Sequence, residues 1–146
     1  MIFSKSFGYA LRGVLYVAMM HDENRNIQVD EIAKRLSVPR YFLGKIMNKV
    51  ARSGILNSTK GPNGVFALNN ATLTTSLVSL LESTNGLDQF SECTLRLRKC
   101  NASDPCPMHD RIKTYKADLL SLLSQTEIGS LLKEDKVDFI RMISVA

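Results

Sequence analysis

Residues 29–52, with the sequence VDEIAKRLSVPRYFLGKIMNKVAR, contain two short helical patterns separated by a turn. In the first pattern apolar residues recur at intervals of three and four, and two acids occupy the first turn, where the helix dipole favours negative charge. Pro39 suits the first position of the second helix, because the N–H that it lacks would have no partner there. The second helix is expected to end near Ser53. Its predicted core face consists of Leu43, Ile46, Met47, Val50 and Ala51. Two helices in this arrangement predict a helix-turn-helix.

Further helical and strand patterns flank this segment. An amphipathic helix is expected from about Ser4 to Met20, with apolar residues along one face. Strands are expected at residues 55–58 and 65–68, and the Asn63-Gly64 pair between them suits a hairpin turn. A helix, a helix-turn-helix and a hairpin in this order predict a winged helix.

The outward face of the second helix of the pair carries basic and amide side chains and no acid, which suits the major groove of double-stranded DNA. The side chains placed to reach base edges are Arg40, Tyr41, Lys45 and Asn48. The expected phosphate contacts, which supply salt-dependent affinity, are Lys5, Lys49, Arg52 and Lys60. At the tip of the predicted wing, Lys60 and Asn63 are expected near the minor groove.

The charge distribution supports contact with a polyanion. Residues 1–70 hold ten basic and four acidic side chains, whereas residues 71–146 hold nine basic and ten acidic ones. A basic part joined to a neutral part is typical of a chain in which only one part meets nucleic acid. The 146-residue length fits one compact domain, and no apolar run is long enough to cross a bilayer. We therefore expect no membrane partner and a cytoplasmic location.

The second half of the chain is predicted to be helical around an irregular segment. A helix is expected from about Thr74 to just before Asn85, and residues 87–107 show no periodicity. A long helix after Pro107 is expected to end near Gln125 and carries leucines on more than one side, which predicts pairing with a second copy. Two shorter helical stretches, residues 127–132 and 135–143, follow.

All three cysteines lie in or at the edge of the irregular segment. Cys93, Cys100, Cys106 and His109 follow the pattern C-x6-C-x5-C-x2-H. An odd number of cysteines in a cytoplasmic chain argues against structural disulfides, so metal chelation is the better interpretation. Structural zinc sites favour closely spaced cysteine pairs, whereas iron-sulfur clusters accept wider spacings and some histidine ligands. The spacing favours a cluster and leaves zinc binding and thiol oxidation open.

These features together resemble the Rrf2 family of bacterial winged-helix transcription regulators, in particular its iron-sulfur members. The resemblance is carried by residues 4–12, 30–52 and 60–64 and by the cysteine pattern, and covers nearly the whole chain. It implies a homodimer, a 2Fe-2S cluster, and regulation of iron-sulfur or redox-stress genes. By that resemblance the cluster ligands are Cys93, Cys100, Cys106 and His109.

Three features of the sequence depart from the family pattern: one interval between cysteines and two glycines. The first cysteine interval has six residues where the iron-sulfur members have five. Gly44 stands at a position of the recognition helix that is acidic in those members, and we interpret it as allowing close approach to DNA. Gly8 stands where nitric-oxide-sensing members supply an acidic ligand, which weakens a nitric-oxide function.

The expected fold is mainly α with a small β-hairpin wing, a winged helix-turn-helix followed by a long C-terminal dimerisation helix. Residues 1–84 are expected to bind DNA, 85–107 to form a cluster-binding loop and 108–146 to form the dimerisation region. The leading hypothesis is a homodimeric repressor of a palindromic operator whose DNA affinity responds to a 2Fe-2S cluster. The alternatives are the same regulator with zinc or thiol oxidation, or a small iron-sulfur electron carrier. No nucleophile-base pair or other catalytic motif is found, so no enzyme activity is expected.

Overall fold

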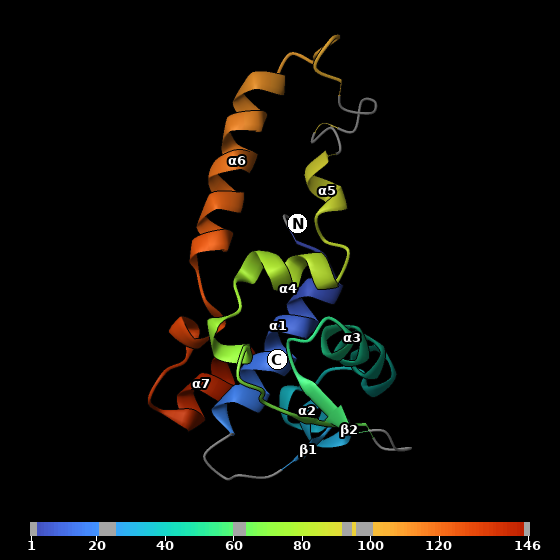
Figure 1. Cartoon of the computed structure of the whole chain (residues 1–146), viewed down its shortest axis with the longest axis vertical. Coiled ribbons are helices and arrows are strands. Elements are labelled where there is room, and N and C mark those ends of the chain that lie inside the picture. Colours follow the sequence, from blue (N-terminus) through green and yellow to red (C-terminus); the bar gives the residue numbers. More distant parts are fainter. Residues whose placement is uncertain (1–2, 21–25, 60–63, 92–94, 96–100, 145–146) are drawn as a thin grey trace.

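The computed structural model describes residues 3–20, 26–59, 64–91, 95 and 101–144 of the chain (Figure 1). A small sheet lies at one end of a helical body, and one long helix, α6, extends past α4 at the other end. The described elements are α1 (Lys5–Met19), β1 (Ile27–Gln28), α2 (Val29–Leu36), α3 (Arg40–Arg52), β2 (Asn57–Thr59), β3 (Val65–Ala67), η2 (Thr72–Thr74), α4 (Leu77–Ser83), α5 (Asp88–Ser91), α6 (His109–Gln125), η3 (Ile128–Leu131) and α7 (Lys136–Ile143). The expected fold, mainly helical with a small wing, is confirmed.

The helix-turn-helix forms where the sequence predicts it. α2 ends at Leu36, and its C-cap residue, Ser37, adopts a left-handed conformation with φ 55°. Pro39 was expected to be the first residue of α3, but it is the N-cap residue that precedes the helix. Its backbone is extended, and its carbonyl accepts a hydrogen bond from the N–H of Leu43 at 3.0 Å. α3 therefore begins at Arg40 and ends at Arg52.

The sheet has three antiparallel strands in the order β1-β3-β2. The strand expected at residues 55–58 begins only at Asn57: Ile55 and Leu56 are buried in the core, and the N–H of Ile55 donates to the carbonyl of Val50 in α3 at 3.3 Å. β1 was not expected, since two residues are too few to show the alternation of a strand. It pairs with β3 through Ile27 opposite Phe66 and so holds the hairpin against the start of α2.

The C-terminal half also differs in detail from the sequence prediction. The segment expected to be irregular contains a four-residue helix, α5, which is too short for periodicity to reveal. Residues 127–132, expected to be helical, form a 3-10 turn preceded by a bridge between Ser76 and Glu127. α6 ends at Gln125, as predicted.

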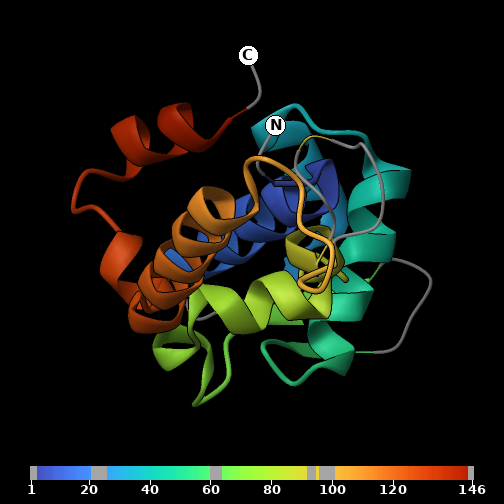
Figure 2. The ribbon, with the colours of Figure 1, turned by 90° about the horizontal axis from the view of Figure 1, so that it is seen from above.

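α1 lies in the middle of the body, with α2, α3, α4 and α7 packed around it (Figure 2). A hydrogen bond of 2.9 Å from the Tyr16 hydroxyl to the Glu31 carboxylate joins α1 to α2. Burial and the neighbouring Glu31 raise the pKa of Tyr16, which keeps the hydroxyl protonated as a donor. At the other side, Arg12 Nε donates to the carbonyl of Ile143 at 2.8 Å and ties α1 to α7.

α1 and α3 pack closely at Gly13. A Cβ atom at this position would meet the sulfur of Met47, which is fully buried. In the part of the chain that the structure describes, no helix combines the length and hydropathy needed to span a membrane.

We predict that Gly13→Ala lowers the free energy of unfolding by about 1 kcal/mol or more, because crowding in a packed core costs about 1–3 kcal/mol and exceeds the helix-propensity gain. Gly44→Ala is the matched control, since a Cβ atom there meets nothing within 4 Å. It should instead raise stability by up to about 1 kcal/mol. Urea unfolding of both variants measures this, and equal shifts in the two would contradict the packing argument. Because the clash is with Met47, Met47→Ala should cost less in the Gly13→Ala background than alone.

Candidate nucleic-acid interface and cysteine segment

The face of α3 opposite the core carries a continuous line of exposed polar side chains. Its buried residues are Leu43, Ile46, Met47 and Val50. On the opposite side Tyr41, Lys45, Asn48 and Arg52 recur at intervals of four, three and four and are all exposed. We call these four residues the outward line of α3. Four of the residues predicted to contact DNA thus share one face.

Within the outward line, Lys45 and Tyr41 form a cation-π pair. Lys45 Nζ lies 4.5 Å from the centre of the Tyr41 ring, and 71% of the tyrosine remains exposed. A hydrogen bond from Lys45 and its positive charge lower the pKa of the Tyr41 phenol. An exposed aromatic ring on a polar face has no role in the core, so its surface is available to a partner.

Arg40, which was predicted to reach base edges, instead contacts Asp30 of α2. Its guanidinium forms an ion pair with the Asp30 carboxylate of α2. Both side chains are about half exposed, at 51% and 50%. The structure therefore places Arg40 at the junction of the two helices rather than in the outward line.

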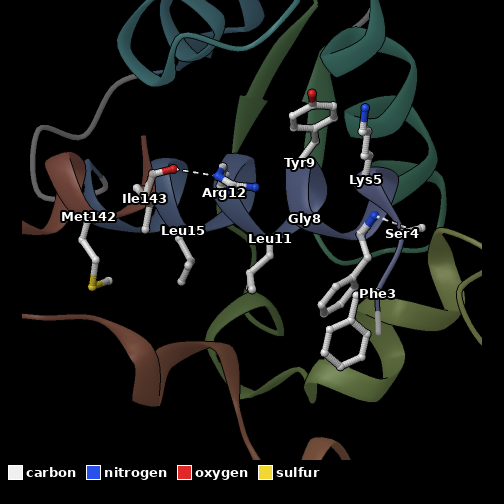
Figure 3. A pocket seen from close by; sticks show the side chains of 11 residues that line it. Phe3, Ser4, Lys5, Gly8, Tyr9, Leu11, Arg12, Leu15, Met142 and Ile143 are labelled. Atoms are coloured by element: carbon white, nitrogen blue, oxygen red, sulfur yellow. Dashed lines mark hydrogen bonds between the residues drawn. The ribbon is translucent and has the colours of Figure 1, made fainter. Parts of the chain in front are cut away.

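A second group of exposed side chains flanks α3 on the side of α1. Phe42 is 52% exposed, and its ring meets that of Tyr9 edge to face at 6.3 Å between centroids. Lys5 lies one helical turn before Tyr9, and both side chains extend to the same side of α1 (Figure 3). Phe42 and Tyr9 were not predicted; the signal was available, because Phe42 falls outside the apolar spacing of the core face.

The wing-tip residues Lys60 and Asn63 lie outside the described residues. The end of the wing loop is described: Gly64 has a positive φ of 30°, and its carbonyl accepts from the N–H of Val29 at 3.0 Å. This bond fixes the return of the wing beside the first residue of α2.

Two of the four predicted metal ligands lie together at the start of α6. Cys106 is a free, half-buried thiol, and the N–H of His109 donates to its carbonyl at 3.0 Å. Cys93 and Cys100 lie outside the described residues, and among the residues that are described no three potential ligands gather. One soft sulfur donor and one imidazole within a single turn fit the mixed ligand set of an iron-sulfur centre.

The stretch of chain just before Cys93 is attached to both α6 and α1. Lys116 Nζ in α6 donates to the carbonyl of Phe90 in α5 at 3.2 Å. The Phe90 ring lies 6.5 Å from that of Phe3, which in turn lies 5.0 Å from that of Phe7. The cysteine segment therefore begins at a cluster of rings that reaches the first turn of α1.

A groove of about 690 Å³ runs along α1 from the ring cluster at Phe3 toward α7 (Figure 3). Its lining is mainly apolar and includes Phe3, Leu11, Leu15 and Met142. Arg12 lies in the groove between Leu11 and Ile143, where its bond to the Ile143 carbonyl holds the guanidinium.

α6 carries an apolar stripe that is partly exposed and that packs against the domain core at Leu119. Leu123 faces inward and is 6% exposed, whereas Tyr115 and Leu122 are 51% and 60% exposed. With the half-exposed Ile112 and Leu119 they recur at intervals of three and four, the spacing of a coiled-coil seam. Ile112, Tyr115, Leu119 and Leu122 are called the α6 stripe below.

Comparison with known proteins relates this architecture to transcription regulators. A family model described as "Rrf2: Iron-dependent Transcriptional regulator" matches residues 3–134. An HTH-type transcriptional regulator of Aquifex aeolicus is 32% identical over 134 residues, which cover 90% of this chain and 92% of the relative. The HTH-type transcriptional regulator IscR of Vibrio vulnificus is 20% identical over 129 residues, covering 88% of this chain and 76% of the relative.

A solved structure shares the fold at low identity. The chain is similar to CymR, the global cysteine regulator of B. subtilis, with a TM-score of 0.69 at 14% identity, covering 89% of this chain and 97% of that one.

Proposed function

This chain belongs to the Rrf2 family of HTH transcriptional regulators, and we propose that it is a homodimeric repressor whose affinity for a palindromic operator depends on a 2Fe-2S cluster. The observation that carries the proposal is the outward line of α3, which combines two cations, an amide and an aromatic ring on the exposed face of a recognition helix. The signal would be iron-sulfur, redox or nitric-oxide status.

In this proposal α3 enters the major groove and the rest of the basic half positions it. Tyr41, Lys45 and Asn48 reach base edges, and Arg40 joins them where it leaves Asp30. The phosphate contacts are Lys5, Lys49, Arg52 and, from the wing, Lys60, with Asn63 near the minor groove. Gly44, beside which the space is open, allows the helix backbone to approach the DNA.

The proposed cluster ligands are Cys93, Cys100, Cys106 and His109. Support comes from the proximity of Cys106 to His109 and from the iron-dependent description of the matching family model. A bound cluster would supply a redox-sensitive group. Residues 92–108 would wrap it, and the start of α6, which His109 opens, would move with that segment.

The α6 stripe supports the proposed homodimer. Four apolar side chains at coiled-coil spacing are more than one domain face needs, and a second copy of α6 would cover them. A two-fold dimer places two recognition helices to read the halves of a palindrome, about 34–36 Å apart for successive turns of DNA.

We predict that the protein binds duplex DNA with an affinity that falls steeply as salt rises, because phosphate contacts release counterions. Lys49→Met should reduce the slope of log affinity against log salt by about 0.9. Lys133→Met, which removes the same charge from an exposed position before α7, is the control and should leave the slope unchanged. Fluorescence anisotropy at several salt concentrations measures both. Failure of the wild-type protein to bind any duplex would refute DNA binding.

The second prediction concerns the cluster. Protein purified without oxygen should absorb visible light and contain iron and acid-labile sulfide in equal amounts. Cys106→Ser and His109→Ala should lose or alter this spectrum, whereas substitution of the other histidine, His21→Ala, should not. A colourless protein with stoichiometric zinc supports the zinc alternative, and a metal-free protein that changes DNA affinity on thiol oxidation supports the thiol one. A cluster-containing protein that binds no DNA supports the electron-carrier alternative.

The third prediction concerns the dimer. Leu122→Glu places a charge in the α6 stripe and should convert the dimer to a monomer at micromolar concentration, as judged by sedimentation equilibrium. Val137→Glu is the matched control, because Val137 on α7 is an exposed apolar residue as well, at 80%. A wild-type protein that sediments as a monomer would overturn the proposed assembly.

A further inference from the structure

We propose that Tyr41 and Lys45 act as one unit that reads two neighbouring base pairs, Lys45 a guanine and Tyr41 the 5-methyl group of a thymine. The inference rests on the proposed DNA binding and names the base sequence that this site selects. It is independent of the cluster and of the dimer.

The two side chains lie at the N-terminal end of the face that is proposed to meet DNA. Both belong to the outward line of α3, one turn apart and opposite the buried Leu43 and Met47. Side chains near the start of a recognition helix are the ones that reach base edges. Arg40, the cation at the start of α3, is paired with Asp30 in the free protein, whereas Lys45 belongs to the outward line itself.

The pair is organised before any DNA arrives. Lys45 Nζ rests over the Tyr41 ring at 4.5 Å, and cation-π attraction holds it there. Two flexible side chains that already share one arrangement lose less entropy on binding than two independent ones. A geometry fixed in the free protein also favours one pattern of bases over others.

The chemistry of each group selects a base. An ammonium is a donor without acceptor capacity, and guanine offers the O6 and N7 acceptors in the major groove. The ring of Tyr41 keeps most of its surface exposed, and thymine is the base whose methyl group offers an apolar contact in that groove. Neighbouring base pairs are about 3.4 Å apart, so two groups separated by 4.5 Å are near enough to contact adjacent base pairs.

The test uses the full-length protein and a pool of random 30-bp duplexes. We expect selection from this pool to enrich duplexes that contain a G·C pair next to a T·A pair. The enriched duplex is then synthesised with deoxyuridine in place of that thymine, which removes only the methyl group, or with 7-deazaguanine in place of that guanine, which removes only N7. Each replacement should weaken wild-type binding about fivefold.

The variants assign each penalty to a side chain. Tyr41→Ser should bind the thymine and uracil duplexes equally, whereas Tyr41→Phe, which keeps the ring, should retain the wild-type penalty. Lys45→Met should bind guanine and 7-deazaguanine equally. Lys49→Met, with the same loss of charge on the flank of α3, should weaken binding overall but retain both penalties. All three substituted positions are exposed, and thermal unfolding confirms the fold of each variant.

The outcomes separate this inference from the proposed function. A wild-type protein that selects duplexes but tolerates both replacements overturns the reading of G and T while DNA binding stands. Penalties that persist in Tyr41→Ser and Lys45→Met also overturn it, because other side chains then make the contacts. If the wild-type protein enriches no sequence and binds no duplex, the proposed function itself fails.

Discussion

The close approach of α1 and α3 at Gly13 sets the position of the recognition helix. Met47 is fully buried, and its sulfur occupies the space that any side chain at residue 13 would need. Buried side chains are packed as densely as in organic crystals, so the helix pair has little freedom to slide. α1 carries Lys5 and Tyr9, while α3 carries the outward line, and the packing at Gly13 and the contact of Tyr9 with Phe42 hold the two helices together. The proposed DNA surface is thus assembled from two helices that behave as one body.

The acids of the helix-turn-helix are arranged so that they leave the outward line of α3 positive. Asp30 forms an ion pair with Arg40 at the helix junction, and Glu31 accepts a hydrogen bond from the Tyr16 hydroxyl on the inner side of α2. Neither carboxylate lies in the outward line. Lys45 and Arg52 therefore stand on a face without an acid. The positive electrostatic potential of this face, which attracts phosphate, depends on the directions of the acidic side chains as much as on the number of lysines.

Periodicity predicted the long helices well and the short elements poorly. α1, α2, α3 and α6 were placed to within a residue or so because each buries a stripe against the same core. The pair Ile55 and Leu56 resembles a strand in sequence, yet both residues are buried beside α3 and the strand starts after them. β1 and α5 have two and four residues, which no period describes.

The sequence predicted those site residues whose positions depend on a single helix, but not the contacts that depend on the packing of two helices. Tyr41, Lys45, Asn48 and Arg52 follow from the spacing of α3 alone. The pairing of Arg40 with Asp30 and the contact of Phe42 with Tyr9 depend on how neighbouring helices meet, which the sequence pattern does not encode. The positions of Cys106 and His109 were local and expected, whereas the ring cluster that joins α5 to α1 was not.

That ring cluster offers a physical route from the cysteine segment to the DNA surface. Phe90 stands three residues before Cys93; it contacts Phe3, and its carbonyl accepts from Lys116 of α6. A rearrangement of the segment would therefore act on α1 and α6 at once. Because α1 and α3 pack closely at Gly13, we expect a displacement of α1 to move the recognition helix with it. In the proposed dimer such a motion changes the separation of the two recognition helices. Successive major grooves on one face of DNA are about 34 Å apart, so a change in that separation lowers the affinity for DNA. In this scheme regulation does not require the DNA-binding part to unfold; it requires only a change in the distance between the two folded DNA-binding parts of the dimer.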